Sequence, residues 1–239
     1  MPPEDPLDVW RRPERSNVGP KPEHSRAVIA AAAIEIADKD GLGAVSIRRV
    51  AASIGAGAAS LYRYVRSRDE LVDLMIDAVS GEYDLKQSSE PAPMQLLGLA
   101  LQGRTIMHRH RWLAPLLLTR PSMGPSALRY LEHALAALES AQMSGPSKLR
   151  TVAMMTAITS AFVQNELASE TSSGDTARDP NGSTRYLAEA VQSGRYPLLA
   201  AALTGQHEPD GPDDVFTTII ATYLEGAGLP GPPDPAECR

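Results

Sequence analysis

The sequence contains one cysteine, Cys238, and few aromatic residues, which make up 5% of the chain. A single cysteine excludes an intrachain disulfide and agrees with a reducing cytoplasm. Scarce aromatic residues with abundant alanine favour helices over a β-sandwich. No apolar run approaches the ~20 residues of a membrane-spanning helix, and residues 1–15 lack the apolar region of a secretory signal. We therefore expect an all-α protein of the cytoplasm.

Common catalytic signatures are also missing. The chain has no Gly-x-Ser-x-Gly nucleophile motif, no phosphate-binding Walker loop and no His-Glu-x-x-His metal motif. His108 and His110 are two positions apart, so their side chains lie on different sides of a helix and are poorly placed to chelate one ion. We expect neither an enzyme nor a protein that carries a metal or another cofactor.

Acidic residues are absent from one particular segment. The chain has a formal net charge of -6, yet no Asp or Glu occurs between Ser46 and Arg68. A concentration of positive charge within an acidic protein indicates a local nucleic-acid surface rather than nonspecific coating of nucleic acid. The basic residues of this segment are Arg48, Arg49, Arg63, Arg66 and Arg68.

The same segment carries the local signals of a helix-turn-helix. Ser46 is a suitable N-cap for a first short helix, and Gly55-Ala56-Gly57 predicts the turn after it. A second short helix is expected over residues 58–64. Ser67 with Glu70 three positions later forms a capping box, so a third helix begins there. Two short helices joined in this way can place the second one in the major groove of DNA.

The second helix of the pair is suited to close contact with base edges. Ala58, Ala59 and Ser60 are small, and Leu61 and Val65 are spaced to anchor the helix from inside. Tyrosine and arginine side chains can hold phosphates, and an arginine can also read guanine. The predicted DNA-contacting residues are Arg48, Ala58, Ala59, Ser60, Tyr62, Arg63, Tyr64 and Arg68. The alternative is a helical protein-interaction module that does not bind DNA.

Residues 23–80 carry several spaced positions that are informative together. They are Gly41, Ser46-Ile47-Arg48-Arg49-Val50-Ala51, Gly55, Leu61-Tyr62-Arg63-Tyr64-Val65 and Arg68-Asp69-Glu70-Leu71. This set resembles the N-terminal domain of the TetR family of bacterial transcription regulators, and its last part resembles the tetracycline-repressor branch. Four positions depart from the family pattern, namely Ala56 and Gly57 in the turn, Ala59 and Tyr64, so the operator sequence does not transfer.

The resemblance implies a homodimeric regulator, by family habit a repressor, with a C-terminal domain that binds a small inducer and then releases DNA. Five prolines predict a disordered arm over residues 1–21, and a Gly- and Pro-rich end predicts a flexible tail over 229–239. Between them we expect a DNA-binding domain over 22–68 and a helical ligand-binding and dimerisation domain over 69–228. The remaining helices are expected over residues 23–39, 67–83, 94–110, 112–118, 126–141, 146–169, 185–192 and 197–203, and from 213 onward.

Two of these helices carry apolar residues on two faces. Such helices are covered on both sides, which predicts that residues 146–169 and the helix from Asp213 form the dimer interface. Family analogy places an inducer cavity among the helices between residues 94 and 169, where apolar positions have polar neighbours. The predicted lining residues are Arg104, Met107, His108, Trp112, Met123, His133, Met155, Thr159, Phe162 and Glu166.

Overall fold

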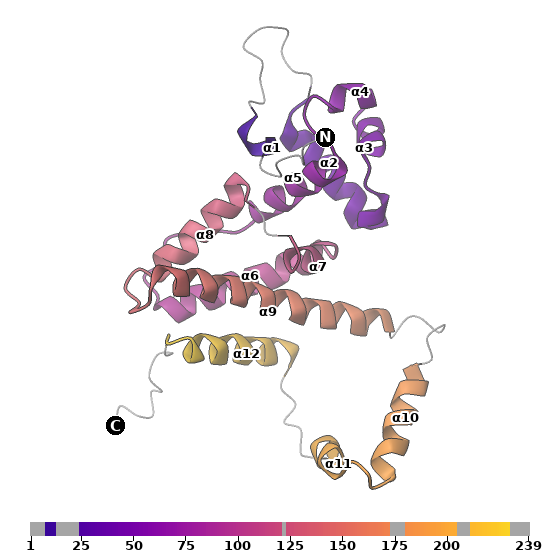
Figure 1. Ribbon diagram of the computed structural model, residues 1–239, viewed down its shortest axis with the longest axis vertical. Helices are drawn as coiled ribbons and strands as arrows, with labels where there is room; N and C mark the ends of the chain where they lie inside the picture. Colours follow the sequence, from indigo (N-terminus) through magenta and orange to yellow (C-terminus); the bar gives the residue numbers. More distant parts are fainter. Residues whose placement is uncertain (1–7, 13–23, 121–122, 173–179, 205–210, 230–239) are drawn as a thin grey trace.

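The computed structural model describes residues 8–12, 24–120, 123–172, 180–204 and 211–229. Every regular element within these ranges is a helix, which confirms the predicted all-α class. Figure 1 shows a small N-terminal group of helices, called the head below, above a larger layer of helices, called the body. No described helix is both long and apolar enough to cross a membrane.

The head consists of α2 (Arg26–Asp40), the short η1 (Leu42–Ala44), α3 (Ile47–Ser53) and α4 (Ala58–Leu61), with the first part of α5 (Arg68–Ser80). Local sequence signals explain its helix ends. The hydroxyls of Ser46 and Ser67 accept hydrogen bonds from the backbone N–H groups of Arg49 and Glu70, which confirms both predicted N-caps. Gly41 ends α2 with a φ of 82°, a conformation that suits glycine.

The long helix α5 connects the head to the body. It packs against α2 in the head and against α8 in the body. Leu71, Met75 and Val79 are spaced by four residues and are fully buried, so one stripe of α5 forms part of the core. The helix α5 therefore contributes to the cores of both the head and the body.

The body is built from α6 (Ala92–Arg109), α7 (Leu113–Leu117), α8 (Pro125–Ala137), α9 (Gly145–Ser172) and α12 (Pro212–Gly226). In Figure 1, α12 runs along α9, with α6 behind them. Leu96, Met155, Phe216 and Ile220 bring α6, α9 and α12 together in a buried cluster. The helices α10 (Pro180–Gln192) and α11 (Pro197–Thr204) pack on each other and lie apart from this layer in Figure 1.

The predicted unstructured ends differ from the structure at three places. The short helix α1 (Asp8–Arg11) lies inside the predicted arm, and its Val9 is fully buried against the head. Helix α10 begins at Pro180, five residues before the helix that we expected over residues 185–192. Leu229, placed in the predicted tail, is buried in the core of the body. The rest of the predicted tail, residues 230–239, lies outside the described residues.

Candidate DNA-binding surface and effector cavity

The turn between α3 and α4 is closed by backbone hydrogen bonds. The N–H of Ala56 donates to the carbonyl of Ala51 at 2.8 Å, and the N–H of Gly55 donates to Ala52 at 3.3 Å. Gly55 has a φ of 68°. This is the Schellman arrangement, in which glycine takes the left-handed position after the helix. The glycine turn thus ends α3 and sets the start of α4.

The anchors of α4 are buried as predicted, and its tip is accessible. Leu61 and Val65 are fully buried, whereas Ala59 and the ring of Tyr62 are exposed, Tyr62 by 52%. Ala58 and Ser60 are partly exposed, and the Ser60 hydroxyl donates to the carbonyl of Gly57 at 2.7 Å. The exposed edge therefore consists of small side chains followed by one aromatic ring.

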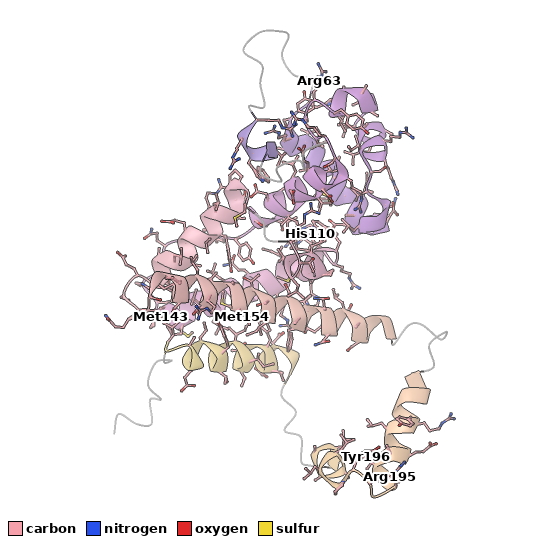
Figure 2. All side chains as sticks on the ribbon, in the orientation of Figure 1. Arg63, His110, Met143, Met154, Arg195 and Tyr196 are labelled. Atoms are coloured by element: carbon pink, nitrogen blue, oxygen red, sulfur yellow. The ribbon has the colours of Figure 1, made fainter. Side chains whose placement is uncertain are left out.

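Two arginines of the head, one on α3 and one just after α4, have their guanidinium groups available. Arg48 and Arg63 are exposed, and within the described part of the chain neither side chain has a hydrogen-bond or ion-pair partner. Figure 2 places Arg63 at the outer end of the head, away from the body. Arg49 differs, because it pairs with Asp40. Of these three arginines, Arg48 and Arg63 have side chains that are free to contact phosphates.

Two other predicted DNA contacts have structural roles. Tyr64 is only 6% exposed and packs in the head core, so the prediction that its side chain faces DNA is not supported. It follows Leu61 by three positions, which turns it to the same inward side. Arg68 donates hydrogen bonds to the carbonyls of Leu42 and Val45, at 2.7 and 3.1 Å. It thereby joins the start of α5 to the segment before α3.

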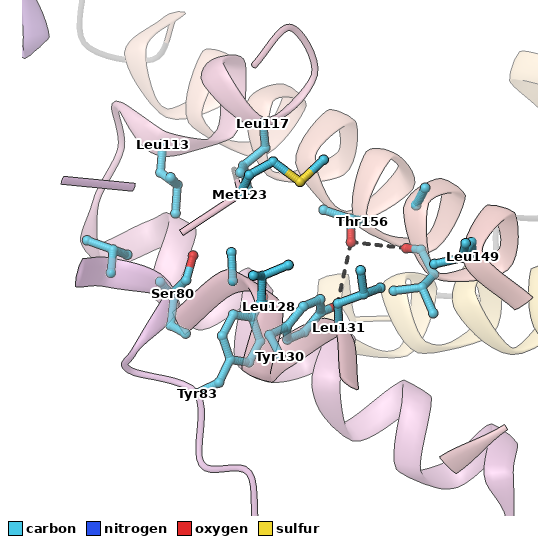
Figure 3. Close-up of a pocket in the computed structure, with 15 residues that line it drawn as sticks. Ser80, Tyr83, Leu113, Leu117, Met123, Leu128, Tyr130, Leu131, Leu149 and Thr156 are labelled. Carbon is cyan, nitrogen blue, oxygen red and sulfur yellow. Dashed lines mark hydrogen bonds between the residues drawn. The ribbon is translucent and has the colours of Figure 1, made fainter. Parts of the chain in front are cut away.

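A cavity of about 370 Å³ lies in the body beneath the head. Residues from α5, α6, α7, α8 and α9 line it, and Figure 3 shows Leu117 and Met123 on the opposite side from Tyr83 and Tyr130. Its apolar lining residues are Val79, Ile106, Leu113, Leu117, Met123, Ala127, Leu128, Leu131, Leu149, Val152 and Ala153. Its polar lining residues are Ser80, Tyr83, Tyr130 and Thr156. The cavity has the size and mainly apolar character of a small-molecule site.

The residues predicted to line an effector cavity are dispersed by the structure. Of that set, only Met123 lies at this cavity. Met107, Met155 and Thr159 are buried core residues. Trp112 is buried where the body meets the head, and its Nε1 donates to Asp38 at 2.7 Å. His133 is partly exposed on α8 without lining the cavity.

The remaining predicted lining residues, Arg104, His108, Phe162 and Glu166, form a cluster on another side of α6 and α9. Arg104 donates to both carboxylate oxygens of Glu166, at 3.0 and 2.6 Å, and to Asp213 of α12 at 2.5 Å. Its guanidinium carbon lies 5.6 Å from the ring centre of Phe162. This cluster joins α12 to α6 and α9 and lies apart from the cavity.

Hydrogen bonds set the acidity of this cluster. Burial alone would raise the pKa of Glu166, but hydrogen bonds from Arg104 and His108, with the positive charge of Arg104, outweigh it and hold that pKa below its usual value. The Nε2 of His108 lies 2.8 Å from Glu166. Because its pKa is lowered, Glu166 is ionised near neutral pH and its interaction with Arg104 is retained.

Apart from Met123, the sequence did not reveal the residues of this cavity, among them the polar Ser80, Tyr83 and Tyr130. Tyr83 lies in the segment after α5 and Tyr130 lies on α8, and their ring centres are 4.6 Å apart. Ser80 lies three residues before Tyr83, near the end of α5. The only sequence signal was this polar cluster at the end of an otherwise apolar stripe, and it did not indicate which helices would face it.

The start of α8 is tied to the helix that leaves the head. The carboxylate of Asp77 on α5 accepts hydrogen bonds from the backbone N–H groups of Ser126 and Ala127, at 2.8 and 3.0 Å. Gly124, the N-cap position of α8, has no capping side chain of its own, and a Cβ there would overlap Asp77. Arg120 contributes a second connection through Asp73 at 2.8 Å. The start of α8 and the segment before it are thus both bonded to α5.

A helix-turn-helix head joined by α5 to a helical body with an apolar cavity defines a DNA-binding regulator with an effector domain. Comparison with known proteins agrees. The family model described as bacterial regulatory proteins, tetR family, matches residues 29–75, and that of the tetracyclin repressor-like C-terminal domain matches residues 93–227. The chain belongs to the TetR family and is a helix-turn-helix transcriptional regulator. This sets aside the alternative of a protein-interaction module that does not bind DNA.

Curated relatives extend over most of the chain. It is 34% identical over 232 residues to the HTH-type transcriptional repressor DrrR1 of Streptomyces coeruleorubidus, covering 92% of this chain and 82% of the relative. It is 33% identical over 210 residues to an HTH-type transcriptional regulator of Saccharopolyspora erythraea, covering 86% of this chain and 84% of the relative.

Solved structures share the fold. Apo ActR of Streptomyces coelicolor is 24% identical, with a TM-score of 0.68 over 88% of this chain and 99% of that chain. ActR in complex with actinorhodin is 22% identical, with a TM-score of 0.69 over 87% and 96%. At this identity the likeness defines the arrangement of helices.

Proposed function

We propose that this chain is a homodimeric transcriptional repressor that contacts operator DNA through α4 and Arg48. A small molecule in the cavity of the body then releases it from DNA. The observation that carries this proposal is the exposed edge of α4, held on buried Leu61 and Val65 and flanked by two unpaired arginines. The related protein DrrR1 is named a repressor, which supports repression rather than activation.

The DNA contacts divide into two kinds. Ala58, Ala59 and Ser60 are small enough for α4 to approach base edges, where alanine methyl groups meet thymine methyl groups. Tyr62, Arg48 and Arg63 surround this edge and are suited to phosphates, with Arg63 also able to reach guanine. Tyr64 is left out of this set because its ring is buried.

The dimer is proposed to form through α9 and α12. These helices pack on each other and on α6, and they keep exposed apolar side chains, namely Met154 on α9 and Ile219 on α12. Two such helices from each of two copies make a four-helix interface with twofold symmetry. The two heads then meet successive half-sites, about 34–36 Å apart along the DNA.

Effector binding is proposed to act through α5. Val79 and Ser80 of this helix line the cavity, while Leu71 of the same helix is buried in the head core. A ligand that prefers a different position of α5 changes the spacing of the two heads. The solved complex of ActR with actinorhodin supports the idea that a body of this fold holds a ligand. No catalytic step is part of this proposal.

DNA binding is tested with duplex DNA from upstream of the chain's own gene, by fluorescence anisotropy at several salt concentrations. We expect Arg48→Ala and Arg63→Ala to weaken binding and to reduce the slope of log K against log salt by about 0.9 for each phosphate that is no longer neutralised. Lys86→Ala removes an equal charge from an exposed site outside the head and serves as the control. An unchanged slope in both arginine variants would contradict the proposed surface.

The dimer is tested by light scattering at micromolar concentration. Met154→Glu combined with Ile219→Glu places charges on the proposed interface, and we expect the measured mass to fall to that of one chain. Val28→Glu, an exposed apolar position on α2, is the control and should leave the dimer intact. A dimeric double variant would exclude this interface.

A further inference from the structure

The walls of the effector cavity carry no charge within the described part of the chain. Every lining residue is apolar or carries a hydroxyl group. The nearby Arg104 is engaged by Glu166 and Asp213 in the separate cluster on α6, α9 and α12. A carboxylate or ammonium group brought into such a cavity would lose water without gaining a counter-ion, which is strongly unfavourable. The cavity therefore selects against ions.

Most hydroxyl groups of the cavity already donate to the protein. Ser80 donates to the carbonyl of Ile76 at 2.8 Å, and Thr156 donates to that of Val152 at 3.1 Å. The Tyr130 hydroxyl lies 3.5 Å from the hydroxyl of Thr156. In the described residues, the Tyr83 hydroxyl has no hydrogen-bond partner, although its ring is largely covered. The strongest unused donor of the cavity is therefore Tyr83.

The Tyr83 hydroxyl remains protonated under ordinary conditions. Burial raises the pKa of Tyr83 well above its usual value, and the neighbouring Tyr130 raises it further. Burial raises the pKa of Tyr130 as well. Because both phenols stay neutral, Tyr83 can donate one hydrogen bond to an oxygen acceptor but cannot neutralise a cation.

The tyrosine pair also provides an aromatic wall. The two rings are tilted by 43°, with centres 4.6 Å apart, and Figure 3 shows them along one side of the cavity. Aromatic faces favour offset stacking with other rings. A cavity of about 370 Å³ can hold a molecule of two to three fused rings, at the lower end of common ligand sites.

We propose that the effector is an uncharged, ring-containing molecule with a carbonyl or ether oxygen that accepts a hydrogen bond from Tyr83. This rests on the proposed role of the cavity as the effector site and adds the chemical class of its ligand. The apolar walls hold the rings, and the single free phenol orients the oxygen. A charged relative of the same molecule binds more weakly, because its charge loses water without gaining a counter-ion.

Two probes that differ only in charge test this class. The full chain is titrated by isothermal calorimetry with anthraquinone-2-carboxylate and with its methyl ester, both of which carry ring carbonyl oxygens. We expect the ester to bind at least about tenfold more tightly than the carboxylate. Equal or tighter binding of the carboxylate, or binding of neither probe up to its solubility limit, would overturn the proposed class.

Substitutions locate the probe and its hydrogen bond. Tyr83→Phe should weaken binding of the ester by about three- to tenfold. Tyr186→Phe, which changes an exposed tyrosine on α10, should leave this affinity unchanged. Ala153→Trp fills the cavity from an exposed position on α9 and should abolish binding. An unchanged affinity in Tyr83→Phe overturns the assigned donor, and an unchanged affinity in Ala153→Trp overturns the assigned cavity.

Release of operator DNA by the same probes separates the ligand class from the proposed function. If the ester binds in the cavity but leaves DNA bound, the effector role is wrong and the ligand class stands. If the carboxylate binds in the cavity and releases DNA, the effector role stands and the ligand class is wrong.

Discussion

The Nδ1 of His110 lies 2.9 Å from both carboxylate oxygens of Asp38, across the junction between body and head. His110 follows α6, whereas Asp38 belongs to α2 of the head. The Nε2 of the same ring lies 2.9 Å from Glu82, and Trp112 shares Asp38. His110 is 4% exposed. The buried ring of His110 therefore connects α2 to the segment after α5. His110 also lies just before α7, a helix that lines the cavity.

The first prediction concerns this junction. His110→Ala removes both contacts and leaves the two carboxylates without their shared partner. We expect the free energy of unfolding to fall by about 1.5–3 kcal/mol, the usual contribution of hydrogen bonds to charged groups. Urea denaturation measures the change.

The control for this junction is His133→Ala, which removes a partly exposed histidine from α8. Its effect should be clearly smaller. Equal unfolding midpoints for the two variants would show that the His110 contacts do not stabilise the junction.

Asp77 gives the second prediction. Asp77→Ala removes the acceptor for two N–H groups at the start of α8, so we expect a loss of about 0.5–2 kcal/mol in the free energy of unfolding. If α8 transmits the state of the cavity to α5, the same variant should also reduce the effect of a bound probe on DNA affinity. Chemical denaturation and anisotropy measure the two effects.

Asp84→Ala is the matched control for Asp77→Ala. The Asp84 side chain is largely exposed and pairs with the exposed Lys86, so its removal should change neither quantity by more than a few tenths of a kcal/mol. A variant of Asp77 that behaves like this control would argue against a capping role.

Two glycines of α6 provide the third prediction. A Cβ at Gly103 would lie 2.6 Å from the hydroxyl oxygen of Tyr83, whereas a Cβ at Gly98 would meet nothing within 4 Å. Gly98→Ala should stabilise the helix by about 0.5–1 kcal/mol. Gly103→Ala must displace Tyr83 and should lower both stability and probe affinity. Thermal unfolding and calorimetry check this pair, and similar behaviour of the two variants would refute the close approach.

The fourth prediction concerns acid stability through Glu166. Its folded-state pKa is lower than its usual value, which is about 4.3 in an unfolded chain. The stabilisation is therefore complete above the unfolded-state pKa and is lost as the pH falls through the folded-state pKa. We expect Glu166→Gln to flatten the decline in stability below about pH 4. Denaturation at a series of pH values measures it, with exposed Glu139→Gln as a control that should keep the wild-type slope.

The sequence predicted the head well because its signals are local. Ser46 and Ser67 each cap a helix through a backbone N–H group only three residues further along the chain. The spacing of Leu61 and Val65 alone indicates which side of α4 is buried. The same spacing argument should have placed Tyr64 inside, three positions after Leu61.

The cavity could not be predicted in the same way. Its lining depends on which side of α6 and α9 faces α8 and which faces α12, and both sides of these helices carry apolar residues. Arg104 and Glu166 were therefore assigned to the cavity although they face α12. Helix periodicity gives a buried face but not the neighbour that covers it.

The docking of α1 has a practical consequence for protein production. Val9 is buried in the head, and Arg12 pairs with Glu70 at 2.5 Å, at the carboxylate that also accepts the N–H of Arg66. A version that starts at α2 would expose the apolar surface that Val9 covers. It would also remove the ion pair between Arg12 and Glu70. Affinity tags and shortened crystallisation variants are therefore best designed to retain the first dozen residues.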